Sequence, residues 1–234
     1  MNIAVIFAGG VGRRMSSGDL PKQFLKMDGK EIIVYTLEVF EHHPLIEGII
    51  VVCIEKWIPH LNRLIEGYGL DKVISVTPGG KTGQESIYNG LEEAGKHYGE
   101  DNIVLIHDGV RPLIDQETIT RCIECTKEKG SAITISPAIE TIIQVEEGQR
   151  VKHIIERSQC LLARAPQTFY LKDILAAHRK AIEEGAPEFI DSASIMNYYD
   201  YPLYTVEGPV ENIKITTPMD YHLFQGLWRG DRER

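Results

Sequence analysis

The sequence predicts a three-layer α/β fold, in which helices cover both faces of a mostly parallel sheet. Short apolar runs recur along the chain and end in glycine or polar turn residues, as strands buried on both faces do. Segments with the spacing of amphipathic helices separate these runs. Alternation of strand and helix implies right-handed crossovers between parallel strands. A length of 234 residues fits one domain, so we expect a single domain over residues 1–234.

The regular alternation covers the chain up to Ile135. Its expected strands are Ile3–Ala8, Gly48–Ile54, Lys72–Val76, Asn102–Ile106 and Ser131–Ile135. The helices expected between and beside them are Glu31–His42, Trp57–Tyr68, Glu85–Tyr98 and Gln116–Glu128.

The alternation stops after Pro137, where residues 138–144 and 150–155 flank an acidic turn and alternate in polarity like a β-hairpin. An insertion of about 20 residues in a compact sheet commonly serves an interface or a site. We therefore expect a β-hairpin arm at about residues 138–158 that reaches another subunit. Beyond it we expect helices Leu171–Glu184, Asp191–Tyr199 and Met219–Trp228, and strands Leu203–Val206 and Asn212–Thr216.

The composition excludes several classes of function. The formal net charge is −9 and no basic block is present, which argues against nucleic-acid binding but allows a small anionic substrate held by a few cations. The longest uncharged apolar stretches fall far short of the roughly 20 residues that cross a bilayer. The N-terminus lacks the pattern of a signal peptide, which predicts a cytoplasmic location. Four cysteines are too few for a disulfide framework, and Cys122 and Cys125 are typical of a helix face.

A glycine-rich loop, Ala8-Gly-Gly-Val-Gly-Arg-Arg-Met15, follows the first expected strand. Glycines let the backbone approach a ligand, and a loop at this edge of a parallel sheet is where nucleotides bind. Arg13, Arg14 and Lys22 add positive charge beside the backbone amides of Gly9, Gly10 and Gly12. The loop therefore predicts a polyphosphate-binding site.

Common nucleotide motifs do not match this loop. A dinucleotide fingerprint needs a third glycine where Met15 stands, and a P-loop ending at Gly80-Lys81-Thr82 would need glycine where Ser75 stands. The chain has no D-x-D sequence, which weakens the interpretation as a metal-dependent glycosyltransferase.

Two further clusters follow apolar runs. In His107-Asp-Gly-Val-Arg-Pro112, Asp108 suits a hydroxyl or a metal ion and Arg111 suits a phosphate, whereas His107 is more typical of a packed residue at a strand end. Lys214 stands between Ile213 and Ile215, where a lysine must either be paired or face an anionic ligand. We expect it to face a ligand.

Six ordered segments resemble the cytidylyltransferase family that includes the methylerythritol-phosphate and ribitol-phosphate enzymes, over essentially the full chain. The matching segments are residues 8–15, 21–24, 79–91 in part, 107–112, 165–169 and 212–216. The resemblance implies a Rossmann-like nucleotidyltransferase sheet. It also implies a reaction in which a polyol phosphate attacks the α-phosphorus of CTP, releasing pyrophosphate and leaving a CDP-polyol.

The resemblance assigns roles to particular residues. Arg14, Lys22 and Lys214 are implied to be catalytic, because they would neutralise charge on the α-phosphate. Mg²⁺ is the implied cofactor, held mainly by the CTP phosphates, with no certain protein ligand. The residues implied to bind the nucleotide are Ala8, Gly9, Gly10, Gly12, Gly80, Ser86 and Asp108. The residues implied to bind the polyol phosphate are Asp108, Arg111, Thr141 and Arg157.

Thr141 and Arg157 lie on or beside the expected hairpin, which in this family crosses to the partner subunit, so the resemblance implies a homodimer. One position departs from the family pattern. In the family, an arginine usually stands three residues before the serine that corresponds to Ser86, but this chain has Gly83 there. Lys81 nearby has the same charge without the planar fork of a guanidinium.

Three alternatives stay open. The acceptor is either methylerythritol phosphate, which leads to isoprenoid precursors, or ribitol phosphate, which leads to surface polymers such as teichoic acid or capsule. Val110 and the sequence Pro-Gln-Thr-Phe resemble the ribitol branch, and the doubled Arg13-Arg14 resembles the isoprenoid branch. Besides a cytidylyltransferase with either acceptor, a second hypothesis is a sugar-phosphate nucleotidyltransferase that uses another nucleotide. A nucleotide-binding module without turnover is the third, although such a module has no need for three cations at one phosphate.

Overall fold

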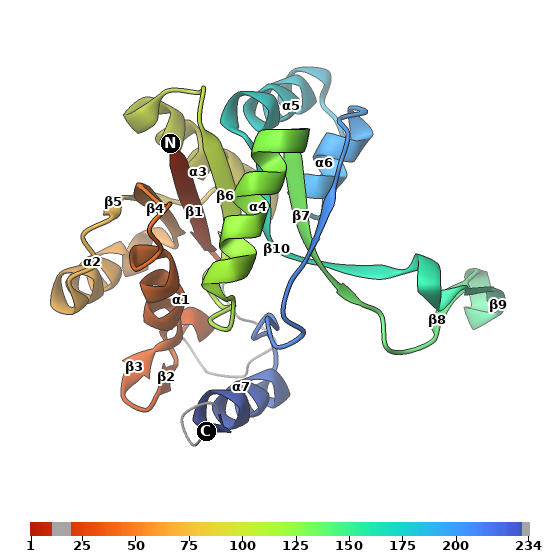
Figure 1. Cartoon of the computed structure of the whole chain (residues 1–234), viewed down its shortest axis with the longest axis horizontal. Helices are drawn as coiled ribbons and strands as arrows, with labels where there is room; N and C mark the ends of the chain where they lie inside the picture. The colour runs from red at the N-terminus through yellow and green to blue at the C-terminus, as the bar shows by residue number, and fades with distance from the viewer. Residues whose placement is uncertain (11–19, 231–234) are drawn as a thin grey trace.

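A seven-stranded sheet forms the centre of the molecule, in the order β11-β7-β10-β6-β1-β4-β5 (Figure 1). The structure is a computed structural model that describes residues 1–10 and 20–230. Every strand of the sheet runs in the same direction except β10, which is antiparallel to both of its neighbours. The predicted mostly parallel sheet is therefore confirmed. The strands are β1 Asn2–Ala8, β4 Gly48–Cys53, β5 Val73–Pro78, β6 Ile103–Asp108, β7 Ser131–Pro137, β10 Leu161–Tyr170 and β11 Thr205–Glu207.

Helices cover both faces of this sheet. Alternate residues of β1 belong to two apolar clusters: Ala4 and Ile6 pack with helices α1, α2 and α4, and Ile3 and Val5 pack with α3, α5 and α6. This division explains why the strand sequences are continuously apolar. The helices are α1 Ile32–Glu41, α2 Ile58–Tyr68, α3 Gly83–Tyr98, α4 Gln116–Lys129, α5 Leu171–Glu184, α6 Ser192–Tyr198 and α7 Pro218–Gly230. Shorter elements are the 3-10 turns Lys22–Phe24, Glu55–Trp57, Glu147–Gln149 and Arg157–Gln159, and the strand pair β2 Lys26–Met27 and β3 Lys30–Glu31.

The strand order reverses at β1. The chain first builds β4 and β5 on one side of β1 and then places β6 on the other side. In open α/β sheets, ligands bind in the crevice at the carboxyl ends of the strands that flank such a reversal. The glycine turn after β1 and the residues that end β6 meet at this point.

One expectation for the last third of the chain is wrong, and one strand was missed. The strand β10 was not expected, and the segment 212–216 forms no strand. This segment runs across the sheet edge and is held by scattered hydrogen bonds, such as that from the Ile215 amide to the Val110 carbonyl, 3.0 Å. Two residues of this segment are fully buried, Asn212 and Ile215, and Lys214 between them is exposed, so its alternating pattern does not depend on a sheet partner.

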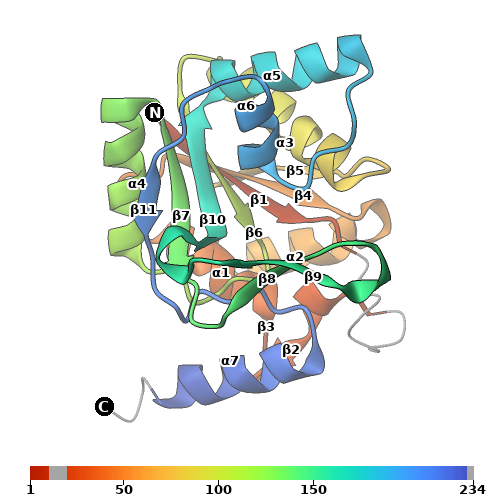
Figure 2. The same cartoon turned by 90° about the vertical axis from the view of Figure 1, so that its right-hand side faces the viewer.

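The predicted hairpin is present as an arm that projects from the body (Figures 1 and 2). Strand β8, Ile142–Val145, pairs antiparallel with β9, Val151–Ile155. Apolar side chains on the arm are open to solvent, with Ile139 75% and Ile154 72% exposed. The assignment of this arm to a dimer interface stays a prediction.

Two smaller expectations concern membranes and cysteines. Within residues 1–10 and 20–230, no helix is long and apolar enough to cross a bilayer. Cys122 is buried on α4, where burial raises the pKa of its thiol to about 11, and all four cysteines are free. The C-x-x-C sequence is thus part of a helix face, as expected.

Candidate active site

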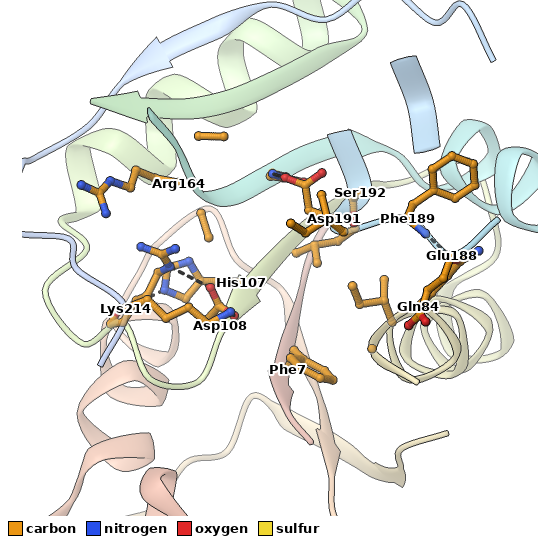
Figure 3. Close-up of a pocket in the computed structure, with 18 residues that line it drawn as sticks. Phe7, Gln84, His107, Asp108, Arg164, Glu188, Phe189, Asp191, Ser192 and Lys214 are labelled. Atoms are coloured by element: carbon orange, nitrogen blue, oxygen red, sulfur yellow. Dashed lines mark hydrogen bonds and ion pairs between the residues drawn. The ribbon is translucent and has the colours of Figure 1, made fainter. Parts of the chain in front are cut away.

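A pocket of about 690 Å³ opens at the carboxyl ends of β1 and β6. Asp108, Arg111 and Lys214 line one end of it, together with Arg164 from β10. Figure 3 shows Arg164, Asp108 and Lys214 on one side of the pocket, and Glu188 on the other. Positive charge is therefore concentrated where the strand order reverses.

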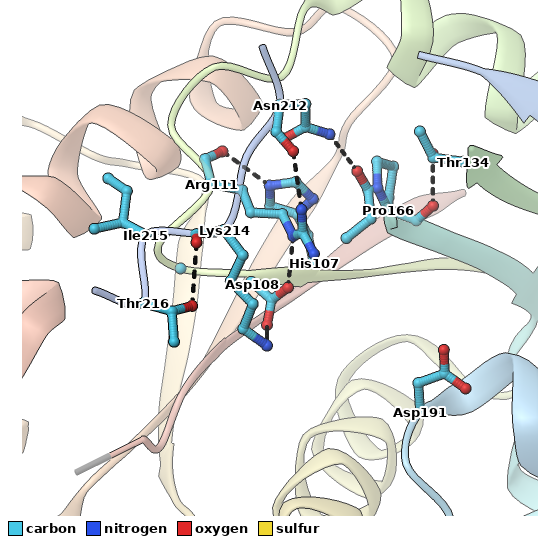
Figure 4. Close-up of polar contacts among 12 residues, drawn as sticks. His107, Asp108, Arg111, Thr134, Pro166, Asp191, Asn212, Lys214, Ile215 and Thr216 are labelled. Carbon is cyan, nitrogen blue, oxygen red and sulfur yellow. Dashed lines mark hydrogen bonds and ion pairs between the residues drawn. The ribbon is translucent and has the colours of Figure 1, made fainter. Parts of the chain in front are cut away.

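Asp108 joins two of these cations. Its Oδ1 lies 2.6 Å from Lys214 Nζ, and its Oδ2 accepts a hydrogen bond of 2.7 Å from Arg111 Nε (Figure 4). Burial alone would raise the pKa of Asp108, but the charges of Lys214 and Arg111 hold it well below its usual range. The carboxylate is ionised and fixes both cations at the mouth of the crevice.

The segment that carries Lys214 is held on three sides. Arg111 Nη1 donates to the Asn212 carbonyl at 2.9 Å, and Asn212 Nδ2 donates to the Ala165 carbonyl at 2.6 Å (Figure 4). Ile215 is fully buried beside Val110. The Lys214 side chain remains 43% exposed and faces the pocket, so it is both paired and open to a ligand.

Lys22 connects the glycine turn with the same segment. Its ammonium donates to the Ile215 carbonyl at 2.9 Å, and its side chain is only 8% exposed. The next residue, Gln23, donates to the Ala8 carbonyl at 2.6 Å. A Cβ on Gly10 would lie 4.0 Å from Lys22 Cε. The structure thus brings Lys22 and Lys214 to one site from positions far apart in the sequence.

Three of the residues expected to bind the nucleotide, Gly9, Gly80 and Ser86, also come together. Ser86 Oγ accepts a hydrogen bond from the Gly80 amide at 2.9 Å and donates to the Thr82 carbonyl at 2.7 Å. A Cβ on Gly9 would lie 3.7 Å from Ser86 Oγ and 2.9 Å from the Phe7 ring. The Phe7 ring is closer than a Cβ allows, so a side chain at Gly9 would have to displace this ring. Gly12 and Arg14 lie outside the described residues.

Gly83 is the first residue of α3 and lines the pocket. Apart from its chain neighbours and the backbone of α3, no atom of the described residues lies within 4 Å of the position that its Cβ would occupy. A side chain can therefore begin at this position without a clash at its Cβ, and the Cβ position gives no steric reason for the loss of the arginine that the family usually carries here.

His107 packs as a strand-end residue. Its Nε2 lies 3.1 Å from the Arg111 carbonyl, so this nitrogen carries the proton, and its ring lies 5.1 Å from that of Phe40. Burial lowers the pKa of His107 to about 4. The imidazole is uncharged near neutral pH and supports the turn that carries Arg111.

Thr141 and Arg157 lie elsewhere. Both are exposed on the arm, where Arg157 Nη1 donates to the Ile139 carbonyl at 3.1 Å. They line a separate hollow of about 340 Å³ and do not line the pocket at Asp108 in the same chain. Their assignment to the acceptor site depends on a second subunit.

The prediction missed Arg164, Gln167 and Asp191, which line the pocket. Gln167 donates to Asp191 at 2.9 Å, and Asp191 also caps α6. One signal was present in the sequence: Arg164 interrupts the apolar run 161–169, just as Lys214 interrupts its own segment.

This sheet order, with a glycine turn and cations at the reversal point, defines a nucleotide-binding α/β protein whose site suits phosphate groups. The chain belongs to the family described as IspD, 2-C-methyl-D-erythritol 4-phosphate cytidylyltransferase, whose model matches residues 2–228. The resemblance seen in the sequence is therefore confirmed.

Named relatives fall into two groups. The chain is 48% identical to a ribitol-5-phosphate cytidylyltransferase of Streptococcus agalactiae, over 97% of this chain and 95% of the relative. It is 50% identical to one of Vibrio parahaemolyticus, with the same coverage. It is 35% identical to a 2-C-methyl-D-erythritol 4-phosphate cytidylyltransferase of Bacillus licheniformis, over 99% of this chain and 98% of the relative.

Solved structures share the fold. The crystal structure of 2-C-methyl-D-erythritol 4-phosphate cytidylyltransferase from Francisella tularensis has a TM-score of 0.77 and 30% identity, covering 98% of this chain and 100% of that one. A 4-diphosphocytidyl-2C-methyl-D-erythritol synthase from Anaerococcus prevotii has a TM-score of 0.84 at 23% identity, covering 97% and 96%.

Proposed function

We propose that this chain transfers CMP from CTP to a polyol phosphate, giving a CDP-polyol and pyrophosphate. The observation that carries the proposal is the placement of Lys214 and Arg111 at the pocket by Asp108, with Lys22 bonded to the backbone of Ile215, the residue next to Lys214. The family membership and the names of its relatives agree with this reaction. Ribitol 5-phosphate is the first acceptor to test, since the more identical of these relatives carry its name.

The chemistry needs placement and charge neutralisation more than a base. An acceptor phosphate oxygen, already anionic near neutral pH, attacks the α-phosphorus of CTP, and the bond from that phosphorus to the β-phosphate oxygen breaks. Lys22 and Lys214 stabilise the charge that develops on the α-phosphate oxygens. Arg14, which lies outside the described residues, is proposed to do the same from the glycine loop.

Mg²⁺ fits this site as an ion bound mainly by the nucleotide and not by the protein. Both carboxylate oxygens of Asp108 are occupied by Lys214 and Arg111, and the described residues contain no cluster of three acidic, histidine or cysteine side chains. The phosphates of CTP are then its main ligands, and it would supply further positive charge to them. Removing free Mg²⁺ with a chelator is expected to abolish turnover.

We further propose that the protein works as a cytoplasmic homodimer. The exposed apolar arm and the distance of Thr141 and Arg157 from the pocket of their own chain support a shared site. The substrates are small phosphates made inside the cell, which supports the location.

Pyrophosphate release tests the reaction. Assays with Mg²⁺ and CTP are run with ribitol 5-phosphate, with methylerythritol 4-phosphate and without acceptor, and are repeated with UTP. Release with CTP and one acceptor alone supports the proposal and identifies the branch. Release only with UTP and a sugar phosphate would instead indicate another nucleotidyltransferase. CTP binding without release under any condition would indicate a nucleotide-binding module.

A further inference from the structure

Arg164 occupies an irregular part of β10. The strand pairs with β7 through Ala163 and Ile135, and next through Gln167 and Ile133, so that three residues of β10 oppose one of β7. A bulge of this kind takes side chains out of the regular ladder and redirects them. Here it places Arg164 at the wall of the pocket.

The backbone of this bulge is firmly held. Thr134 Oγ1 donates to the Pro166 carbonyl at 2.7 Å, and Asn212 Nδ2 donates to the Ala165 carbonyl at 2.6 Å (Figure 4). Through Asn212 the bulge is joined to the segment of Lys214 and to Arg111, which donates to the Asn212 carbonyl. The position of Arg164 is therefore fixed relative to the cations already described.

The guanidinium of Arg164 has unused donors. Its Nε donates to Ser136 Oγ at 3.0 Å, and Ser136 is 1% exposed. No carboxylate among the described residues forms an ion pair with it, and both Nη nitrogens are left to donate. The side chain is half-buried, and both burial and the positive charge of Arg111 lower the pKa of Arg164. A half-buried cation beside another cation is stabilised by an anion.

We propose that Arg164 binds the phosphate group of the acceptor through its two Nη nitrogens, with Ser136 holding the guanidinium in place. The planar fork suits two oxygens of one phosphate and leaves a third free to attack CTP. Glu188 at the far end of the pocket disfavours the reverse orientation, which leaves that end to the hydroxyl groups of the polyol. This inference rests on the proposed function, because it places the nucleophile of that reaction.

The test compares Arg164→Met with Arg164→Lys and with a control, Arg179→Met. Arg179 is partly exposed and pairs with Glu92 and Glu100 away from the pocket. The Arg164→Met variant is expected to raise KM for the polyol phosphate about 10- to 100-fold, as loss of hydrogen bonds to a charged group does, and to change KM for CTP less than about twofold. Arg164→Lys recovers part of the loss because it keeps the charge without the fork, and the control behaves as wild type.

A second measurement separates this inference from the proposed function. Inorganic phosphate is titrated by calorimetry into each variant with saturating CTP and Mg²⁺ but no acceptor. Weaker phosphate binding in Arg164→Met than in wild type supports the subsite even if no polyol phosphate is turned over, in which case only the proposed function fails. An unchanged acceptor KM in a folded Arg164→Met variant overturns the subsite and leaves the function intact. If Arg164→Met does not fold, an acceptor KM in Arg164→Lys equal to that of wild type overturns it.

Discussion

Asp108 organises the candidate site at the level of single residues. Its two oxygens are shared between a lysine from the end of the chain and an arginine three residues further along. The pair of Lys214 and Asp108 holds the ammonium in place before a ligand arrives. Preorganised charges of this kind need little rearrangement as the reaction proceeds.

Removing either lysine is expected to stop catalysis without unfolding the chain. Lys22→Ala and Lys214→Ala should each lower kcat about 100- to 1000-fold, the usual loss when one preorganised charge or donor is removed. Steady-state pyrophosphate release measures the effect, and far-ultraviolet circular dichroism checks the fold. Lys172→Ala, at an exposed pair with Asp101, serves as the control. Wild-type rates in both lysine variants would contradict the mechanism.

Restoring the family arginine is expected to strengthen CTP binding. Gly83 lines the pocket and has open space around its Cβ position, so Gly83→Arg can be accommodated. A guanidinium there would add a hydrogen bond to a charged group, lowering KM for CTP about 10-fold. Gly83→Met, which adds bulk without charge, separates the two effects. A KM for CTP that is unchanged or higher in Gly83→Arg, relative to Gly83→Met, would contradict this role.

At the level of elements, the central strands could be predicted because each is a run of apolar residues that can be recognised without the rest of the chain. The apolar runs of β1, β4 and β6 reflect burial on both faces, which is a local property of the sequence. Strand β10 could not be predicted in this way. Its first residues are exposed, a proline lies within it, and only pairing with β7 and β6 makes it a strand.

The same distinction holds for the site. The glycine turn, Asp108 and Arg111 follow apolar runs that form strands, so their place at the sheet edge follows from the sequence. Arg164 depends on the bulge in β10, and the fixed position of Lys214 depends on Asn212 bonding to the Ala165 carbonyl. These contacts join residues far apart in the chain, and no local pattern encodes them.

The arm leads to a prediction at this scale. Ile154 lies on β9 of the arm and is 72% exposed, and burying it in a dimer would stabilise the assembly. Ile154→Asp is therefore expected to convert the dimer to monomer in sedimentation velocity. Ile182→Asp, at a 60% exposed position on α5, is the matched control and should leave the dimer intact. A dimer that persists in Ile154→Asp would exclude the arm from the interface.

For the whole molecule, the proposal of an active site shared between two subunits makes a specific prediction. Arg157→Ala damages the arm and Lys214→Ala damages the pocket, so each homodimer should be inactive. In a mixed dimer, one of the two sites combines an intact pocket with an intact arm. Random mixing of equal amounts makes about half of the dimers mixed, so it restores about a quarter of wild-type activity. Activity is measured after subunit exchange. No recovery in demonstrated mixed dimers would show that each arm serves its own chain.

Buried histidines should make the stability of the whole fold depend on pH. His178 is 2% exposed, and burial lowers its pKa to about 4 from an ordinary value near 6.5. The unfolded chain takes up the proton first, so stability is lost as pH falls from 6.5 to 4. His107 acts in the same direction.

His178→Leu removes one of these groups. The slope of unfolding free energy against pH should decrease by about 1.4 kcal/mol per pH unit in the middle of this range. Urea denaturation at several pH values measures the slope, with the exposed His222→Leu as the control. A slope equal to that of wild type would show that His178 takes up its proton in the folded chain as well.

The central claim is that an acceptor phosphate oxygen attacks the α-phosphorus of CTP in this site. The most direct test supplies Mg²⁺, CTP and ribitol 5-phosphate labelled with ¹⁸O in its phosphate, or methylerythritol 4-phosphate labelled in the same way, and follows the products by ³¹P NMR. We expect a CDP-polyol with ¹⁸O in the bridge between its two phosphorus atoms, and unlabelled pyrophosphate. Label in the released pyrophosphate, or no CDP-polyol with either acceptor, would contradict the account.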